Sequence, residues 1–236
     1  MYRFSCLACA GFAIVLCACS DAVHGNGKLA SEDRPVSGFV AVESASSFDV
    51  KVERRATFGV HVDVDSNIEP LLYTRVEGDT LVIGSDEQVT DLLPGPHVTV
   101  GMPELRAATL SGSGLLLVTG FEENDPVRLD LSGSGNVDFH GSAPTITARL
   151  DGSGEIDLAG SSDRLELALD GSGSIDARAL PARVGSVGLA GSGRVLTTVS
   201  ERVEVSLSGS GKVDLFGGAS VGKVSKTGSG DIEQHD

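Results

Sequence analysis

The stretch LSGSGNVDFHG, residues 131–141, places a Gly-Ser-Gly tripeptide between two short segments of alternating apolar residues. The tripeptide recurs at 112–114, 133–135, 152–154, 171–173, 191–193, 209–211 and 228–230. Successive copies lie 21, 19, 19, 20, 18 and 19 residues apart. Seven copies at so constant a period are not typical of a linker, and they predict a repeat architecture.

The segments that flank the tripeptide repeat as well. Leucine stands two positions before the first glycine in six copies, and Lys226 replaces it in the last. A β-branched or leucine residue stands two positions after the final glycine in every copy: Leu116, Val137, Ile156, Ile175, Val195, Val213 and Ile232. Alternation with a period of two indicates strands. Each unit is therefore expected to hold two strands around a tight turn, closed by a looser connection of about six residues such as AGSSDR, residues 159–164.

A unit of this length cannot bury its own apolar face, but stacked units can, with strands about 4.8 Å apart. The sequence therefore predicts an all-β fold, a parallel β-solenoid over residues 107–236. Propeller blades need about 40 residues, which is twice this period. Leucine-rich repeats have a similar length, but their L-x-x-L-x-L-x-x-N pattern is missing.

Glycine suits the corner of a coil, because it adopts positive φ without a Cβ penalty and lets neighbouring corners approach closely. The glycines expected to make these turns are Gly112, Gly114, Gly133, Gly135, Gly152, Gly154, Gly171, Gly173, Gly191, Gly193, Gly209, Gly211, Gly228 and Gly230. The serines between them, Ser113 to Ser229, are expected to form a column along one edge.

Residues 37–106 lack the tripeptide but alternate in strand fashion, as in FDVKVE and GVHVDVD. EGD, residues 77–79, is expected to turn a hairpin between LLYTRV and TLVIGS. Because an uncovered solenoid end exposes apolar edges, this strand-rich part is expected to cap or begin the solenoid.

The first residues are typical of a secretory signal: a charge at Arg3, an apolar run, and small residues before Cys19. This ending resembles a bacterial lipobox, which implies a lipoprotein signal peptide over residues 1–18, cleavage before Cys19, lipidation of Cys19, and a polar tether over residues 19–36. The alternative is an ordinary signal peptide that is cut nearby. All four cysteines lie at or before Cys19, so no disulfide is expected in the folded part.

The chain is strongly acidic. It has 18 basic and 33 acidic residues, and removal of Arg3 with the signal gives 17 − 33 = −16. Such a charge disfavours nucleic acid and anionic lipid as partners. The absence of tryptophan argues against a carbohydrate platform built on aromatic stacking.

Residues 37–236 resemble the bacterial envelope family of auto-transporter adhesin heads, or GIN domains. The resemblance rests on FDVKVERRATFGVHVDV, EGDTLVIGS, VTVGMPELRAATLSGSG and the repeated GSG units, in that order. It implies a right-handed parallel β-helix on a secreted or lipid-anchored protein, and it supplies no catalytic residues.

Acidic side chains recur three positions after the tripeptide. The candidate cation or ligand edge comprises Asp138, Asp157, Asp176, Asp214 and Glu233, with Leu196 interrupting the column. Stacked carboxylates raise one another's pKa or recruit cations, so calcium is one interpretation. The other is a solvated row that keeps the face soluble. No dedicated metal site is expected, because the five histidines lack metal-ligand spacing.

We therefore expect a non-catalytic envelope protein without a cofactor. It would be anchored at Cys19, with the outer membrane favoured, and would bind an envelope or extracellular polymer or protein as an adhesin does. One alternative is a structural envelope protein without a dedicated ligand. Another is a polysaccharide-active enzyme, which fold analogy alone supports weakly.

Overall fold

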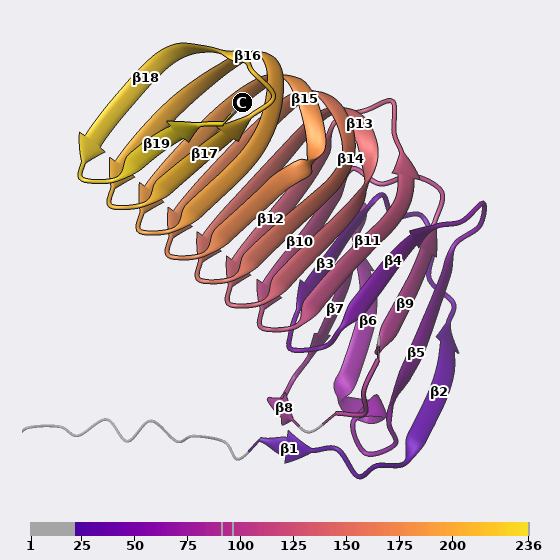
Figure 1. Cartoon of the computed structure of the whole chain (residues 1–236). Helices are drawn as coiled ribbons and strands as arrows, with labels where there is room; N and C mark the ends of the chain where they lie inside the picture. The colour runs from indigo at the N-terminus through magenta and orange to yellow at the C-terminus, as the bar shows by residue number, and fades with distance from the viewer. Residues whose placement is uncertain (1–21, 91, 96, 236) are drawn as a thin grey trace, which may run out of the picture.

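The computed structural model describes residues 22–90, 92–95 and 97–235, and it is built almost entirely from strands (Figure 1). The N-terminal strands are β1 (Val23–His24), β2 (Leu29–Arg34), β3 (Ala41–Ala45), β4 (Val50–Arg54), β5 (Gly59–Asp65), β6 (Leu72–Glu77), β7 (Thr80–Ser85), β8 (Val89–Thr90) and β9 (Val98–Met102). The repeats supply β10 (Ala107–Gly112), β11 (Leu115–Glu122), β12 (Val127–Gly133), β13 (Asn136–Gly152), β14 (Glu155–Gly171), β15 (Ser174–Gly191), β16 (Arg194–Gly209), β17 (Lys212–Phe216), β18 (Ser220–Gly228) and β19 (Asp231–Gln234). One short 3-10 helix, η1 (Glu69–Leu71), precedes β6. No described helix is long and apolar enough to cross a membrane.

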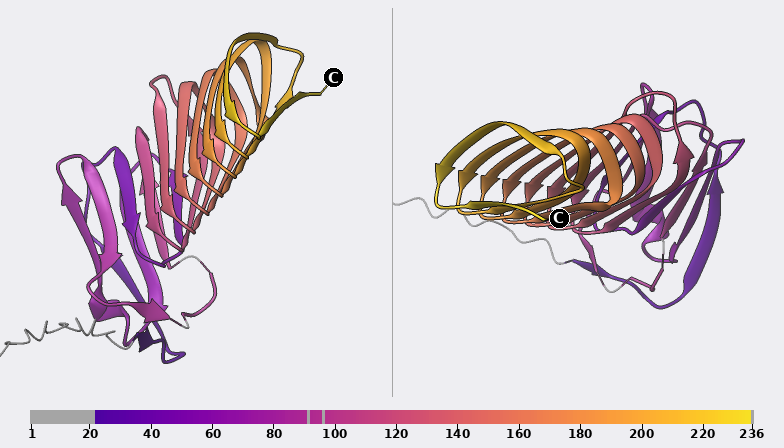
Figure 2. Two further views of the ribbon diagram at one scale, coloured as in Figure 1. Left: turned by 90° about the vertical axis from the view of Figure 1, so that its left-hand side faces the viewer. Right: turned by 45° about the horizontal axis from the view of Figure 1, so that its top comes forward.

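The repeats form the predicted β-solenoid, and adjacent coils pair in parallel. Each coil has two flat sides. We call the side whose strands lead into the Gly-Ser-Gly turns the lead-in face, and the side whose strands leave them the lead-out face. Figure 2 shows these coils stacked along one axis.

The pairing register matches the columns that the sequence predicts. Leu131 pairs with Leu150, and Val137 pairs with Ile156, so like residues stack on like residues. These side chains point inward and are at most 1% exposed. The core therefore consists of leucine and β-branched columns that run the length of the stack, where each buried methylene contributes about 0.8 kcal/mol.

The Gly-Ser-Gly turns hydrogen-bond directly to one another. The amides of Ser153 and Gly154 both donate to the carbonyl oxygen of Gly133 in the preceding coil, at 2.9 and 3.2 Å. Gly152 has φ of 134°, and a Cβ built on it would lie 2.3 Å from the same oxygen. The tripeptide is therefore needed both for the backbone conformation and for the close approach of adjacent corners.

The connection opposite these turns is tighter than the sequence indicates. β13, β14 and β15 run through it as continuous paired strands, so residues 159–164 are not a loose loop. Gly141 pairs with Gly160 at this corner, and a Cβ on Gly160 would lie 1.7 Å from the carbonyl oxygen of Gly141. A second, shorter glycine column thus serves the opposite corner.

The N-terminal strands extend the same stack in an altered order. β3 and β4 form a coil that pairs with β10 and β11, although it has no Gly-Ser-Gly turn. β7 and β9, which come later in the chain, form the next coil outward, against β3 and β4. The second coil in space, β3 and β4, therefore comes first in the chain. The outermost coil, β7 and β9, follows it, and the chain then continues along the solenoid from β10.

Antiparallel strands close this end of the stack. β6 pairs with β7 through the predicted hairpin at residues 77–79, and β5 pairs with β9. β2 adds an outer strand against β5, from Leu29 opposite Asp65 to Arg34 opposite Val60. The predicted cap is present, and these strands cover the apolar edge of the first coil (Figure 1).

The expected tether over residues 19–36 is wrong in its described part, because Leu29–Arg34 belongs to the sheet. The polar sequence ASED is typical of a tether, but here it belongs to an edge strand, β2, with most of its side chains in solvent. Asp65, which is fully buried, also holds this region by accepting hydrogen bonds from the amides of Gly27 and Leu93.

Candidate functional site

The lead-in face carries an open groove of about 510 Å³ that spans several coils. Its outward side chains fall into two paired rows. One row runs Thr109, Asp130, Arg149, Ala168, Gly188 and Ser206, and the other runs Ser132, Asp151, Asp170, Ala190 and Ser208. Charged residues at one end give way to alanine, glycine and serine toward the other, and these small side chains form the floor of the groove.

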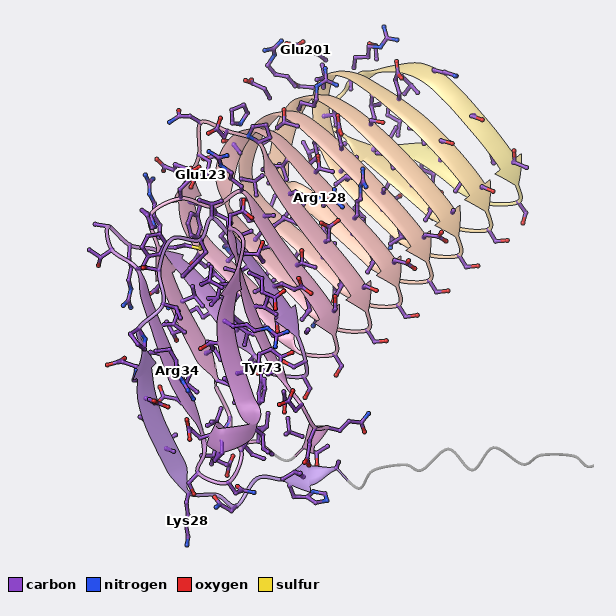
Figure 3. All side chains as sticks on the ribbon, turned by 180° about the vertical axis from the view of Figure 1, so that it is seen from behind. Lys28, Arg34, Tyr73, Glu123, Arg128 and Glu201 are labelled. Carbon is purple, nitrogen blue, oxygen red and sulfur yellow. The ribbon has the colours of Figure 1, made fainter. Side chains whose placement is uncertain are left out.

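Charges gather where the groove begins. The Arg128 guanidinium donates to Asp130 at 2.5 and 3.0 Å on the outer side of these strands (Figure 3). Arg149 lies on the next strand, in the row of Asp130, and the described structure gives its guanidinium no ion pair. The groove therefore presents a free guanidinium beside carboxylates, and then a smooth floor of small residues.

The predicted acidic column lies on the lead-out face. Asp138, Asp157 and Asp176 are paired in register, Leu196 follows, and then Asp214 and Glu233. The structure thus brings the five residues into one column, as expected, but Leu196 divides them into two groups.

The upper group, which we define as Asp138, Asp157 and Asp176, contains one carboxyl whose pKa is raised and one whose pKa is lowered. Burial raises the pKa of Asp157, and the neighbouring charges of Glu155, Asp138 and Asp176 raise it further. In contrast, hydrogen bonds from the Arg178 guanidinium lower the pKa of Asp176, against the effect of burial. Arginine thus neutralises one end of the group, and Asp138 and Asp157 are left without an ion pair among the described residues.

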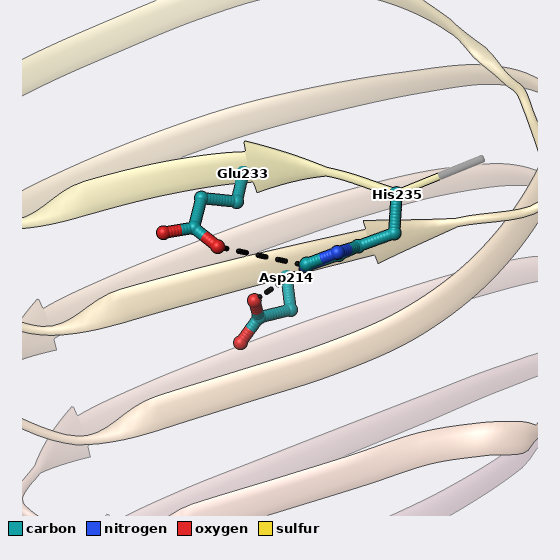
Figure 4. Close-up of side chains that lie close together, drawn as sticks. All are labelled: Asp214, Glu233 and His235. Atoms are coloured by element: carbon teal, nitrogen blue, oxygen red, sulfur yellow. Dashed lines mark hydrogen bonds and ion pairs between the residues drawn. The ribbon is translucent and has the colours of Figure 1, made fainter.

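The lower group consists of Asp214 and Glu233. It belongs to a compact ionic cluster around Asp214, whose side chain is only 1% exposed. Its Oδ2 accepts from Arg194 Nε and Nη2 at 2.8 and 2.7 Å, and its Oδ1 lies 2.8 Å from His235 Nε2 (Figure 4). Burial alone would raise the pKa of Asp214, but the hydrogen bonds from His235 and Arg194 outweigh it, so the pKa is lowered. The His235 ring also stacks on Phe216, with centroids 4.6 Å apart. The cluster thus fastens the C-terminal strand to the coil below it.

Asp214, Glu233 and His235 also meet the spacing of a metal site, since one ligand atom of each lies within 4.8 Å of the others. The donors are already engaged, however. Lys212 Nζ lies 2.8 Å from Glu233 and 3.4 Å from Asp214, and Arg194 holds the other oxygen of Asp214. Two cationic side chains balance two carboxylates, so the residues fit an ion-paired fastening better than a cation site.

A second groove, of about 440 Å³, lies beside the upper acidic group. It is lined by His140, Asp157, Leu158, Ala159, Asp176, Arg178 and Ala179. An imidazole, a carboxylate with a raised pKa and an arginine thus meet on the lead-out face, and sequence spacing had not connected them.

The serine edge is exposed along the stack, and a groove of about 430 Å³ runs beside Ser134, Ser153, Ser172 and Ser192. One hydrogen bond joins serines of neighbouring turns, between the hydroxyls of Ser210 and Ser229 at 3.2 Å. The predicted column therefore exists, but backbone amides and not serine hydroxyls hold the turns together. The predicted lipidation residue, Cys19, lies outside the described residues.

Sequence reasoning missed the cationic partners of the acidic column. Arg194 and Lys212 stand directly after the tripeptide, one column away from the aspartates, and Arg178 stands two residues after Asp176. Basic residues within two positions of Asp176 and Asp214 were a usable signal, since alternate residues of a strand share a face.

Solved structures share this fold at low sequence identity. One from Bacteroides fragilis, described as a putative adhesin, is 19% identical over 91% of this chain and all of its own, with a TM-score of 0.78. Another, from Parabacteroides distasonis and described as a putative lipid binding protein, is 22% identical with the same coverage and a TM-score of 0.75. A putative adhesin from Parabacteroides merdae is 20% identical over 92% of this chain and all of its own, with a TM-score of 0.63.

No curated protein matches the chain. The sequence profile of one family matches residues 38–219, which include the cap strands from β3 onward and most of the solenoid. The chain therefore belongs to the family described as "Putative auto-transporter adhesin, head GIN domain".

Proposed function

We propose that the protein is a non-catalytic, adhesin-like binding module of the cell envelope, anchored through a lipid on Cys19, with the outer membrane favoured. Membership of the adhesin head family and the lipobox-like sequence before Cys19 support this proposal. The groove on the lead-in face carries the binding part of it, because a long and open groove on a rigid face suits an extended partner.

The floor of the groove allows a sharp test. Gly188 faces outward in a regular strand, and a Cβ placed on it would meet only the carbonyl oxygen of Leu167, at 3.9 Å. Gly188→Trp should therefore fill the groove without disturbing the core. Asn136→Trp is the matched control, because Asn136 is exposed at the start of a lead-out strand and lies outside this groove.

The experiment measures binding of the chain from Ser20 onward, which contains the whole described fold, to peptidoglycan, envelope polysaccharides and extracellular matrix proteins. We expect saturable binding to one of these that Gly188→Trp abolishes and Asn136→Trp retains. Equal binding by both variants would place the ligand elsewhere. Absence of saturable binding to any of them would favour a structural envelope protein without a dedicated ligand.

The anchor has its own test. Metabolic labelling with a fatty acid should modify the full chain, and Cys19→Ala should abolish the label. Surface accessibility on intact cells then reports which side of the membrane the protein faces.

One observation favours a second function. The lead-out groove gathers His140, Asp157 and Arg178, and burial raises the pKa of Asp157, which is the direction that favours a general acid. A polysaccharide-active enzyme would release product from a polysaccharide panel, and Asp157→Asn would stop that release. No product from any substrate would leave the binding module as the function.

A further inference from the structure

The last coil of the described solenoid has no strand on its outer side. Within the described residues, β18 pairs only with β16, and β19 only with β17, so the outer backbone groups of both strands lack strand partners. Val221 and Val224 stand in register with the buried Val203 and Val205, yet they are 38% and 49% exposed. Figure 2 shows this last coil at the end of the stack away from β2, β5 and β6.

The charges at this end are sorted by strand. β18 contains Lys223 and Lys226 and no acidic residue, while β19 contains Asp231 and Glu233 and no basic residue. β18 leads into the last Gly-Ser-Gly turn and β19 leads out of it, so the two strands run in opposite directions on opposite faces.

We propose that two copies of the chain associate through these ends, with β18 of each copy pairing antiparallel with β19 of the other. A two-fold axis parallel to the strands produces this pairing twice, and closed symmetry of this kind is the usual basis of a dimer. The basic strand of each copy then lies beside the acidic strand of the other, and the exposed valines are covered.

Charge disfavours the other arrangements of the same end. A two-fold axis perpendicular to the strands would place β18 on β18 and β19 on β19, so like charges would meet twice. Head-to-tail stacking would bring acidic β19 to the lead-out side of the cap, where the outer strand β2 carries Glu32 and Asp33 against a single cation, Arg34. The sorted charges therefore favour the pairing of β18 with β19.

Lysine on an edge strand commonly protects against pairing, and Lys226 occupies the core column above Leu207. Its ammonium lies 4.0 Å from Asp231 of the same chain, so it enters the contact with a counter-ion. Two short strand pairings bury less area than the roughly 1,600 Å² of a standard interface. The dimer is therefore weak in solution and gains strength when many copies share a surface.

One consequence rests on the proposed anchoring near Cys19. The described chain begins at residue 22 beside the cap, at the far end of the stack from β18 (Figure 1). A dimer through the C-terminal ends would place the two anchors at the outer ends of a doubled rod. The second copy would then belong to another membrane, and the contact would be homophilic adhesion.

Analytical ultracentrifugation of the chain from Ser20 onward tests the dimer through charge reversal. Lys223→Glu with Lys226→Glu makes both end strands acidic, and Asp231→Lys with Glu233→Lys makes both basic. Each double variant should be monomeric alone, and an equimolar mixture should associate at least as well as the wild type. A monomeric wild type at all concentrations, or a mixture that stays monomeric, would overturn the proposal.

Glu233 also contacts Lys212, so its substitution could destabilise the fold. Two further measurements therefore distinguish a lost interface from a misfolded chain. Circular dichroism melting of each double variant must show a folded chain before its association is interpreted. Val224→Asp, at an exposed side chain outside the ionic cluster, should weaken the wild-type dimer by an independent route, and an unchanged dimer would count against the proposed interface.

Vesicle clustering separates the dimer from the anchoring. The protein is attached to nickel-lipid vesicles by a histidine tag at either terminus, so no native lipid is needed. Attachment at the N-terminus should cluster vesicles, and attachment at the C-terminus, or the Asp231→Lys, Glu233→Lys variant, should not. A dimer in solution without clustering would overturn the membrane-bridging geometry, whereas loss of lipid labelling at Cys19 would overturn only the anchor.

Discussion

Individual glycines determine how closely the coils approach. A Cβ on Gly152 would lie 2.3 Å from the carbonyl oxygen of Gly133, at φ of 134°, and one on Gly154 would lie 2.3 Å from the carbonyl oxygen of Gly135. Both clashes involve backbone that the neighbouring coil holds in place. The two outer positions of the tripeptide are therefore constrained for related reasons, and only the first also needs positive φ.

Gly152→Ala and Gly154→Ala should each lower the free energy of unfolding by more than about 1 kcal/mol, because the coils must separate to admit the methyl group. Gly188→Ala is the control, since its Cβ meets nothing closer than 3.9 Å and its φ is not positive. Urea unfolding followed by circular dichroism measures all three. A Gly152→Ala protein as stable as Gly188→Ala would contradict the role of the turn.

Asp157→Asn should stabilise the fold at neutral pH. Because the pKa of Asp157 is raised, its charged form is less favourable in the folded state than in the unfolded state. This cost is present above the folded pKa and is lost as the pH falls through it and the carboxyl is protonated. The melting temperature of the variant should therefore exceed that of the wild type at pH 7. The difference should shrink as the pH falls through the raised pKa and vanish below about pH 4, the ordinary pKa of an aspartate.

Asp86→Asn supplies the control for net charge, because Asp86 is exposed and lies outside the acidic column. An equal rise in both variants would show that overall charge, and not the column, is responsible.

At the level of elements, the order of the repeats was predictable and the order of the strands in the cap was not. Leucine above leucine and glycine above glycine specify one register, because a shift of one residue would put the apolar residues on the wrong face and a larger shift would separate the glycines of adjacent turns. The strands of the cap alternate equally well, but no repeated column tells which strand lies beside which. The sequence therefore contained no indication that β7 and β9 lie outside β3 and β4. It also contained no indication that the polar strand β2 pairs with β5.

The acidic column shows the same limit for the candidate site. Its alignment followed from the period, but its chemistry depends on the side chains of Arg178, Arg194 and Lys212, which reach across from neighbouring positions. The carboxylate with which a long basic side chain pairs depends on the geometry of the fold. The sequence therefore predicts the column of carboxylates but not which of them are neutralised.

Calcium should not change the melting temperature. Calcium takes six to eight oxygen ligands, whereas only Asp138 and Asp157 stand adjacent in the column without a cationic partner. Scanning calorimetry in millimolar calcium and in EDTA should give coincident transitions. A rise with calcium that Asp157→Asn removes would restore the cation interpretation.

For the whole molecule, the stack behaves as a one-dimensional array in which each coil contacts its neighbours. Deletion of residues 155–173 removes one complete coil and rejoins Gly154 to Ser174, so the column order and the next tripeptide are preserved. We expect this variant to fold with native-like circular dichroism and a smaller urea m-value, because it exposes less surface on unfolding. Deletion of residues 155–164 removes a similar kind of sequence but breaks the register, and that chain should lose the cooperative transition. If both deletions unfolded alike, the coils would depend on contacts beyond their immediate neighbours, and the apolar columns would not be what holds the solenoid together.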